Sequence, residues 1–156
     1  MPNILRKKNR IRFSLLSLLL LVVAGSIVAI LVRPHFAPPL KWREFSASEL
    51  RAQQGLGHPV VVFYRDDWWQ GFDDLQNQLI TDESELAIRK SGAVLMVANN
   101  TLKNTTVESE LIRVAGTNFM PTVAIYSSQR SPILLRRRIT ASTLVDALSQ
   151  LNESAR

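Results

Sequence analysis

The most prominent feature of the hydropathy pattern is an uncharged, strongly apolar stretch over residues 13–32. A helix of roughly twenty residues spans about 30 Å, which matches the hydrocarbon core of a bilayer. The preceding segment, 1–12, carries five basic residues, and a basic flank of this kind stays in the cytoplasm. The pattern therefore predicts a cytoplasmic tail over 1–12, a transmembrane signal anchor over 13–32 and an exported remainder of the chain.

Prolines dominate the segment that follows the anchor. Residues 33–44 hold three of the seven prolines in the chain. Proline fixes its φ angle and has no amide hydrogen to donate, so such a segment favours an extended, semi-rigid spacer. We therefore expect a stalk over 33–44, a folded domain over 45–151 and a short tail over 152–156.

Within 45–151, short apolar runs alternate with amphipathic stretches. Runs rich in β-branched and aromatic residues indicate buried strands, and apolar residues spaced by three or four indicate helices. Ser46 with Glu49, and Thr105 with Glu108, have the spacing of helix-capping boxes. In chain order we expect a helix over 46–55, a strand over 60–64, helices over 71–80 and 82–90, a strand over 93–98, a helix over 105–116, strands over 122–127 and 133–139, and a helix over 141–151. This order predicts an α/β fold with a central mixed sheet of about four strands flanked by helices, behind one N-terminal transmembrane helix.

Composition excludes several classes of function. Of the nineteen lysines and arginines, five lie in the tail over 1–12, so residues 33–156 carry a net charge of only 14 − 13 = +1. This balance argues against nucleic-acid binding by the folded part. The chain has no cysteine, which excludes disulfide bonds, thiolate metal sites and thiol chemistry carried by the chain itself. We expect neither a metal nor a cofactor.

Residues 58–72, HPVVVFYRDDWWQGF, resemble the first strand and redox loop of thioredoxin-like proteins. In that family an apolar strand led by a proline ends in an acidic residue, a tryptophan and a C-x-x-C motif. Trp68 matches the tryptophan, whereas Trp69 and Phe72 stand at the two cysteine positions. The resemblance implies a thioredoxin-like fold for about residues 45–151.

Three later segments are similar to the C-terminal periplasmic domain of the DsbD family of thiol:disulfide interchange proteins. They are VLMVANNT from Val94, IRVAG from Ile112 and Met120-Pro121-Thr122. Pro121 matches the cis-proline that lies beside the redox loop in this family. The resemblance implies a bacterial protein of the inner membrane, with a single span and its C-terminal domain in the periplasm.

The chemistry of that family depends on residues that this chain lacks. The nucleophile in disulfide exchange is a thiolate, so Trp69 and Phe72 cannot take part in it. Phe63 stands where many thioredoxins place a buried acid that assists proton transfer. The resemblance therefore implies a redox-inactive relative, not a disulfide oxidoreductase, that acts as a protein-binding or assembly module.

A binding groove can persist after the chemistry is lost. In the family, the redox loop and the residue before the cis-proline form a groove that pairs with an extended segment through main-chain hydrogen bonds, which need no sulfur. The residues that would surround this groove are Trp68, Trp69, Phe72, Phe119, Met120 and Pro121. The partner would be an envelope protein or an extended peptide segment. The alternative for Trp69 and Phe72 is that they turn inward and close the groove.

Two other functions stay open at this point. The acidic residues Asp66, Asp67, Asp73 and Asp74 would suit an enzyme that uses a divalent cation, although aspartates at a helix start also stabilise the positive end of the helix dipole. The other alternative is an accessory subunit of an inner-membrane complex, in which the apolar helix over 13–32 binds the helices of its partners.

Overall fold

The computed structural model describes residues 38–66, 68, 71–101 and 104–153 of the 156-residue chain. The expected tail over 1–12, the anchor over 13–32 and residues 33–37 of the stalk lie outside these ranges. Within them, no helix has both the length and the apolar character that a membrane span requires. The transmembrane anchor over 13–32 therefore stays a prediction.

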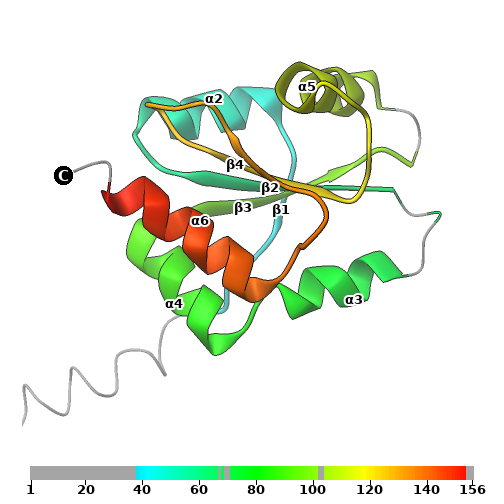
Figure 1. Cartoon of the computed structure of the whole chain (residues 1–156). Helices are drawn as coiled ribbons and strands as arrows, with labels where there is room; N and C mark the ends of the chain where they lie inside the picture. The colour runs from blue at the N-terminus through cyan, green and yellow to red at the C-terminus, as the bar shows by residue number, and fades with distance from the viewer. Residues whose placement is uncertain (1–37, 67, 69–70, 102–103, 154–156) are drawn as a thin grey trace, which may run out of the picture. The chain divides into compact units, whose positions relative to one another are not determined.

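A mixed sheet of five strands forms the centre of the fold (Figure 1). The strands lie side by side in the order β1-β3-β2-β4-β5. Strands β1 and β2 run parallel to β3, whereas β4 runs antiparallel to both β2 and β5. Their bounds are Arg43–Glu44 for β1, Val60–Arg65 for β2, Val94–Asn99 for β3, Thr122–Tyr126 for β4 and Ile133–Leu135 for β5.

Strand β1 is one more strand than the sequence indicated, and it lies in the segment expected to be the stalk. Arg43 and Glu44 pair with β3, and the amide of Phe45 donates to the carbonyl of Val97 at 2.9 Å. Leu40 and Trp42 also pack against the hydrophobic core. The folded part therefore begins before residue 45, because the run of prolines ends at residue 39 and the following residues again supply amide hydrogens and apolar side chains.

Five helices cover the two faces of this sheet (Figure 1). Helices α3, α4 and α6 lie against one face, and α2 and α5 lie against the other. Their bounds are Ala47–Gly55 for α2, Gly71–Gln78 for α3, Asp82–Ser91 for α4, Thr105–Ala115 for α5 and Ala141–Glu153 for α6. The arrangement confirms the expected α/β class, with helices in two layers around a mixed sheet.

The central strand β2 divides the core into two halves. Val61 and Phe63 point towards α3, α4 and α6, whereas Val60, Val62 and Tyr64 point towards α2 and α5. All five side chains are fully buried. Successive side chains of a strand point to opposite faces of the sheet, so a run that is apolar at every position belongs to a strand covered on both sides.

Most element boundaries lie within one or two residues of the sequence-based expectation, and the start of α5 and the end of β5 are informative differences. Helix α5 is capped by Asn104, whose side chain accepts hydrogen bonds from the amides of Thr106 at 3.1 Å and Val107 at 3.4 Å. The N-cap is therefore Asn104 and not Thr105, and the expected capping box with Glu108 is not formed. Strand β5 ends at Leu135 instead of continuing to residue 139, because the guanidinium of Arg136 turns to the carbonyl of Ala115 at the end of α5.

Two glycines at helix ends should respond to alanine in opposite ways. Gly92 ends α4 with φ +67°, a left-handed conformation that costs a residue with a Cβ about 1 to 2 kcal/mol. Gly55 belongs to α2, and a Cβ there would meet nothing within 4 Å. We expect Gly92→Ala to lower the free energy of unfolding by about 1 kcal/mol and Gly55→Ala to raise it by about 0.5 kcal/mol. Urea denaturation checks both values, and equal effects of the two changes would contradict this account.

Candidate functional site

The candidate site lies where β2 and β4 come to the same end of the sheet (Figure 1). The last paired positions are Tyr64 in β2 and Thr122 in β4. Because these strands are antiparallel, the loop that leaves β2 and the segment that enters β4 emerge together. The Met120-Pro121 peptide bond in the entering segment is cis, as the resemblance implied.

Two aromatic side chains of the predicted groove are exposed at this end of the sheet. Trp68, in the loop after β2, is 75% exposed, and Phe119, before β4, is 57% exposed. Met120 and Pro121 are half-buried, and Met120 packs against both halves of the core. Trp69 lies outside the described residues. Trp68, Phe119, Met120 and Pro121 thus lie in the two segments that meet at this end of the sheet, and we call these four residues the cis-proline surface.

Phe72 does not belong to the cis-proline surface, because its side chain is only 1% exposed. Its ring meets that of Phe63 with centroids 6.4 Å apart and that of Trp68 with centroids 6.5 Å apart, both in edge-to-face geometry. Phe63 in turn lies 6.2 Å from the ring of Trp42. Of the two possibilities for Phe72, the structure shows inward packing: the residue at the second cysteine position is part of the core.

Arg65, the last residue of β2, connects the strand to the helix that follows the loop. Its guanidinium pairs with the carboxylate of Asp73 at 2.5 Å and donates to the side chain of Gln76 at 3.4 Å. It also lies 6.0 Å from the centre of the Phe72 ring, a cation–π distance. The Arg65 side chain is only 15% exposed. Arg65 thus ties together the two ends of the loop that presents Trp68.

The acidic residues of this region do not form a metal site in the part of the chain that the structure describes. Asp73 is engaged by Arg65, Asp74 points into solvent from the first turn of α3, and Asp67 lies outside the described residues. Among the described residues, no three histidine, cysteine, aspartate or glutamate side chains gather closely enough to hold a metal ion. The geometry therefore gives no support to a metal-dependent enzyme.

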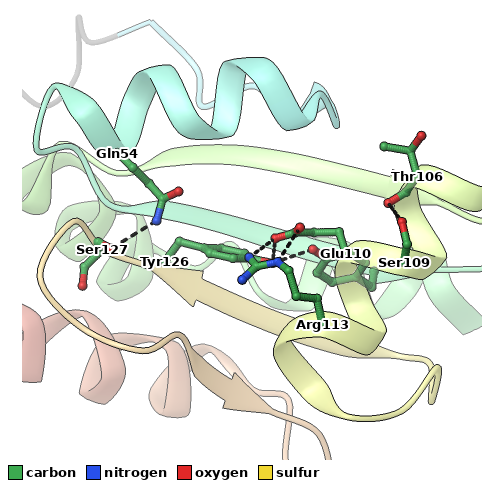
Figure 2. A network of polar contacts seen from close by, with 8 residues as sticks. Gln54, Thr106, Ser109, Glu110, Arg113, Tyr126 and Ser127 are labelled. Atoms are coloured by element: carbon green, nitrogen blue, oxygen red, sulfur yellow. Dashed lines mark hydrogen bonds and ion pairs between the residues drawn. The ribbon is translucent and has the colours of Figure 1, made fainter.

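A polar network that the sequence did not predict lies on the face of the sheet covered by α2 and α5 (Figure 2). The hydroxyls of Tyr64 and Tyr126 are 2.6 Å apart, and Tyr126 also donates to Glu110 at 3.3 Å. Arg113 donates to both carboxylate oxygens of Glu110, at 2.9 Å and 2.5 Å. One sequence signal was available: the buried stripe of α5, which includes Val107, Leu111 and Val114, is interrupted by an acid.

The strand register explains how two distant tyrosines meet. Tyr64 is paired with Thr122, and Tyr126 is paired with Val60. The two tyrosines therefore lie on the same face of the sheet, separated along the strands by one pair of side chains on that face. The pair between them is Val62 with Ala124. The small side chain at position 124 leaves room for the two rings to extend towards each other across the sheet.

Burial and charge set the ionisation of this network. Burial raises the pKa of Tyr64 and of Tyr126 well above the ordinary value for tyrosine. The hydrogen bonds from Arg113 lower the pKa of Glu110. Both hydroxyls therefore stay protonated and the carboxylate stays ionised near pH 7. The network joins α5 to the sheet, and a hydrogen bond of 3.1 Å from Gln54 to the carbonyl of Ser127 similarly joins α2 to the end of β4 (Figure 2).

Comparison with known proteins identifies the fold of the chain but not its family. Neither a family model nor a curated protein sequence matches the chain. Among solved structures, the short form of thioredoxin f from spinach chloroplast has a TM-score of 0.53 and 17% identity, covering 72% of this chain and 94% of that one. Chloroplastic thioredoxin z has a TM-score of 0.52 and 14% identity, covering 75% and 99%. The zinc-bound form of human ERp44 has a TM-score of 0.51 and 11% identity, covering 70% of this chain and 32% of that one.

These similarities define the class of protein. The chain has a thioredoxin-like α/β fold with a mixed five-stranded sheet. It spans only about a third of the ERp44 chain, with 32% coverage. Unlike a redox-active thioredoxin, it contains no cysteine anywhere in its sequence.

Replacing Phe72 should cost far more stability than replacing Trp68. Removal of a buried phenylalanine side chain typically costs about 3 to 5 kcal/mol. Trp68 is exposed, so its loss costs only the edge-to-face contact, about 1 kcal/mol. We expect urea denaturation of Phe72→Ala and Trp68→Ala to show this difference. If Phe72→Ala does not fold, Phe72→Leu should still unfold at lower urea than Trp68→Ala. Equal losses would show that Phe72 is not a core residue.

The charge of Glu110 should stabilise the protein above acidic pH. Because the pKa of Glu110 is lower in the folded chain than its ordinary value of about 4.3, this stabilisation is present above that value and is lost as the pH falls through the folded pKa. We expect Glu110→Gln to lower the free energy of unfolding by about 1 kcal/mol at pH 7 and by less as the pH falls below about 4.

Denaturation curves between about pH 3 and pH 7 test this dependence on Glu110. Asp146→Asn is the matched control, because Asp146 is exposed on α6. This change should alter the free energy of unfolding little at any pH in this range. A difference between Glu110→Gln and the unmodified protein that stays constant across the range would contradict the assignment.

Proposed function

We propose that this chain is a redox-inactive thioredoxin-like protein that binds a segment of another protein at its cis-proline surface. The observation that carries the proposal is the exposure of Trp68 and Phe119 at the end of the sheet where the cis bond before Pro121 lies, in a chain that has no cysteine. Large aromatic side chains are enriched in protein interfaces and often contribute most of their binding energy.

The loss of redox chemistry is supported by what occupies the relevant positions. Phe72 stands where the family has its second cysteine, and it is buried against Phe63, which stands where many thioredoxins have an acid. Neither side chain can donate or accept a proton or an electron pair in disulfide exchange. We accordingly propose that this protein does not catalyse disulfide exchange.

The binding role is supported by the way the cis-proline surface is held. The Arg65–Asp73 ion pair joins residues on either side of the loop, and the ring of Phe72 meets that of Trp68 edge to face. The carbonyl of Phe119 accepts a hydrogen bond of 2.7 Å from Thr122. Binding to a surface that is already held in place costs less conformational entropy than binding to one that must be ordered.

The cellular setting is part of the same proposal. The apolar stretch over 13–32, the five basic residues before it and the resemblance to the periplasmic domain of the DsbD family support an anchor in the bacterial inner membrane. The folded domain would then lie in the periplasm, and its partner would be an envelope protein. The carrying observation at Trp68 does not depend on this setting.

Photo-crosslinking from Trp68 tests the proposal. The full-length chain, with Trp68 replaced by a photo-reactive amino acid, is produced in cells of the source bacterium, irradiated and analysed by mass spectrometry. We expect one discrete envelope protein to be captured from position 68 and not from position 146, an exposed site on α6. The same proteins captured from both positions, or none from either while the chain is folded and abundant, would overturn it.

A further inference from the structure

Acidic residues are concentrated in one part of the folded chain. Residues 66–88 contain seven of the thirteen aspartates and glutamates and no lysine or arginine. This stretch begins in the loop that presents Trp68 and continues through α3 into α4. Of these acids, Asp66, Asp73 and Asp74 flank Trp68 in the chain, on the loop side of the cis-proline surface.

Two arginines at the ends of this stretch each pair with one of its acidic residues. Arg65 is largely buried and is engaged by Asp73, and Arg89 pairs with Glu85 at 2.5 Å. Among the described residues, neither Asp66 nor Asp74 has an ion-pair partner. Both carboxylates are near Trp68 in the chain, one before it and one in the first turn of α3. Asp74 is exposed and Asp66 is half-buried, so both carboxylates can be reached by a cation of a partner.

Helix capping accounts for only part of this pattern. Acidic residues in the first turns of α3 and α4 stabilise the positive ends of those helices. Asp66 is outside any helix, however, and capping does not explain why the indole of Trp68 is left exposed beside it. An exposed tryptophan ring attracts a lysine or arginine through its negative face. The acidic side chains and the exposed ring of Trp68 therefore both favour a cationic ligand.

We propose that the segment recognised at the cis-proline surface is cationic: an extended stretch in which lysine or arginine alternates with apolar residues. Its basic side chains meet Asp66, Asp74 and the ring of Trp68, and its apolar side chains meet Phe119 and Met120. Alternate side chains of an extended segment point in opposite directions, which suits a surface that is acidic on one side and apolar on the other. This inference rests on the proposed function and names the class of its partner.

Peptide binding to the full-length chain in non-ionic detergent tests the inference. The probes are three decapeptides with a neutral dye: one in which lysine alternates with valine, and two in which glutamate or serine replaces every lysine. Fluorescence anisotropy gives each affinity. We expect the lysine peptide to bind at least about tenfold more tightly than the glutamate peptide at about 0.05 M salt, and this ratio to fall towards one at about 1 M salt.

Variants locate the effect within the surface. The double change Asp66→Asn and Asp74→Asn should weaken binding of the lysine peptide about three- to tenfold and leave the serine peptide unchanged. Phe119→Ala should weaken both peptides by a similar factor, because it removes apolar contact only. Asp146→Asn, which removes one exposed carboxylate on α6, is the control for a charge change away from the cis-proline surface and should change neither affinity.

The outcomes separate this inference from the proposed function. Equal affinity for the three peptides, or an unchanged affinity of the Asp66 and Asp74 double variant, would overturn the cationic class while a specific crosslink from Trp68 still supported a binding surface. No binding of any peptide would also overturn the inference. Only an empty or non-specific crosslink would remove the proposed function itself.

Discussion

The burial of β2 on both faces is the constraint on which the other parts of this fold depend. Its five side chains from Val60 to Tyr64 are shielded from water, so each must be apolar or find a hydrogen-bond partner inside the protein. Four are apolar, and Tyr64 finds Tyr126. Because successive side chains of a strand alternate between the two faces, Phe63 points towards α3, α4 and α6, and Tyr64 points towards α2 and α5. Each helical layer therefore packs around an aromatic ring from the same strand.

This constraint gives a physical account of how the site departs from the thioredoxin pattern. Phe63 and Phe72 are in direct ring contact, and Trp42 and Trp68 extend the series at its two ends. An acid at position 63 would place a carboxylate between apolar rings, where an ionised group is costly. Phe63 and Phe72 therefore form one packing unit. The same contact holds the start of α3 against the sheet, and the ring of Phe72 also contacts the exposed Trp68.

Local signals predicted most of the elements, and non-local contacts account for what was missed. Neighbouring residues determine strand β2, whose apolar run is unbroken. They also determine the ends of α4, which is capped by Thr81 and Gly92. Strand β1 has only two residues and exists because it pairs with β3, more than fifty positions away. The tyrosine pair joins residues separated by 62 positions. At the site, the cis bond before Pro121 was predictable from the resemblance. The sequence left both a surface and a core position open for Phe72, because an aromatic residue after a glycine fits either.

The two outermost strands of the sheet have a consequence for contacts between copies of this protein. β1 has two residues and β5 has three, so each edge offers few free main-chain groups to a neighbouring molecule. Long, flat edges promote sheet-to-sheet aggregation, and natural proteins shorten or charge them to avoid it. Arginines follow β5 at positions 136–138, and they add mutual repulsion at one of these edges. Copies crowded side by side would thus stay separate, and contacts with other proteins would be directed to side chains instead of to open strands.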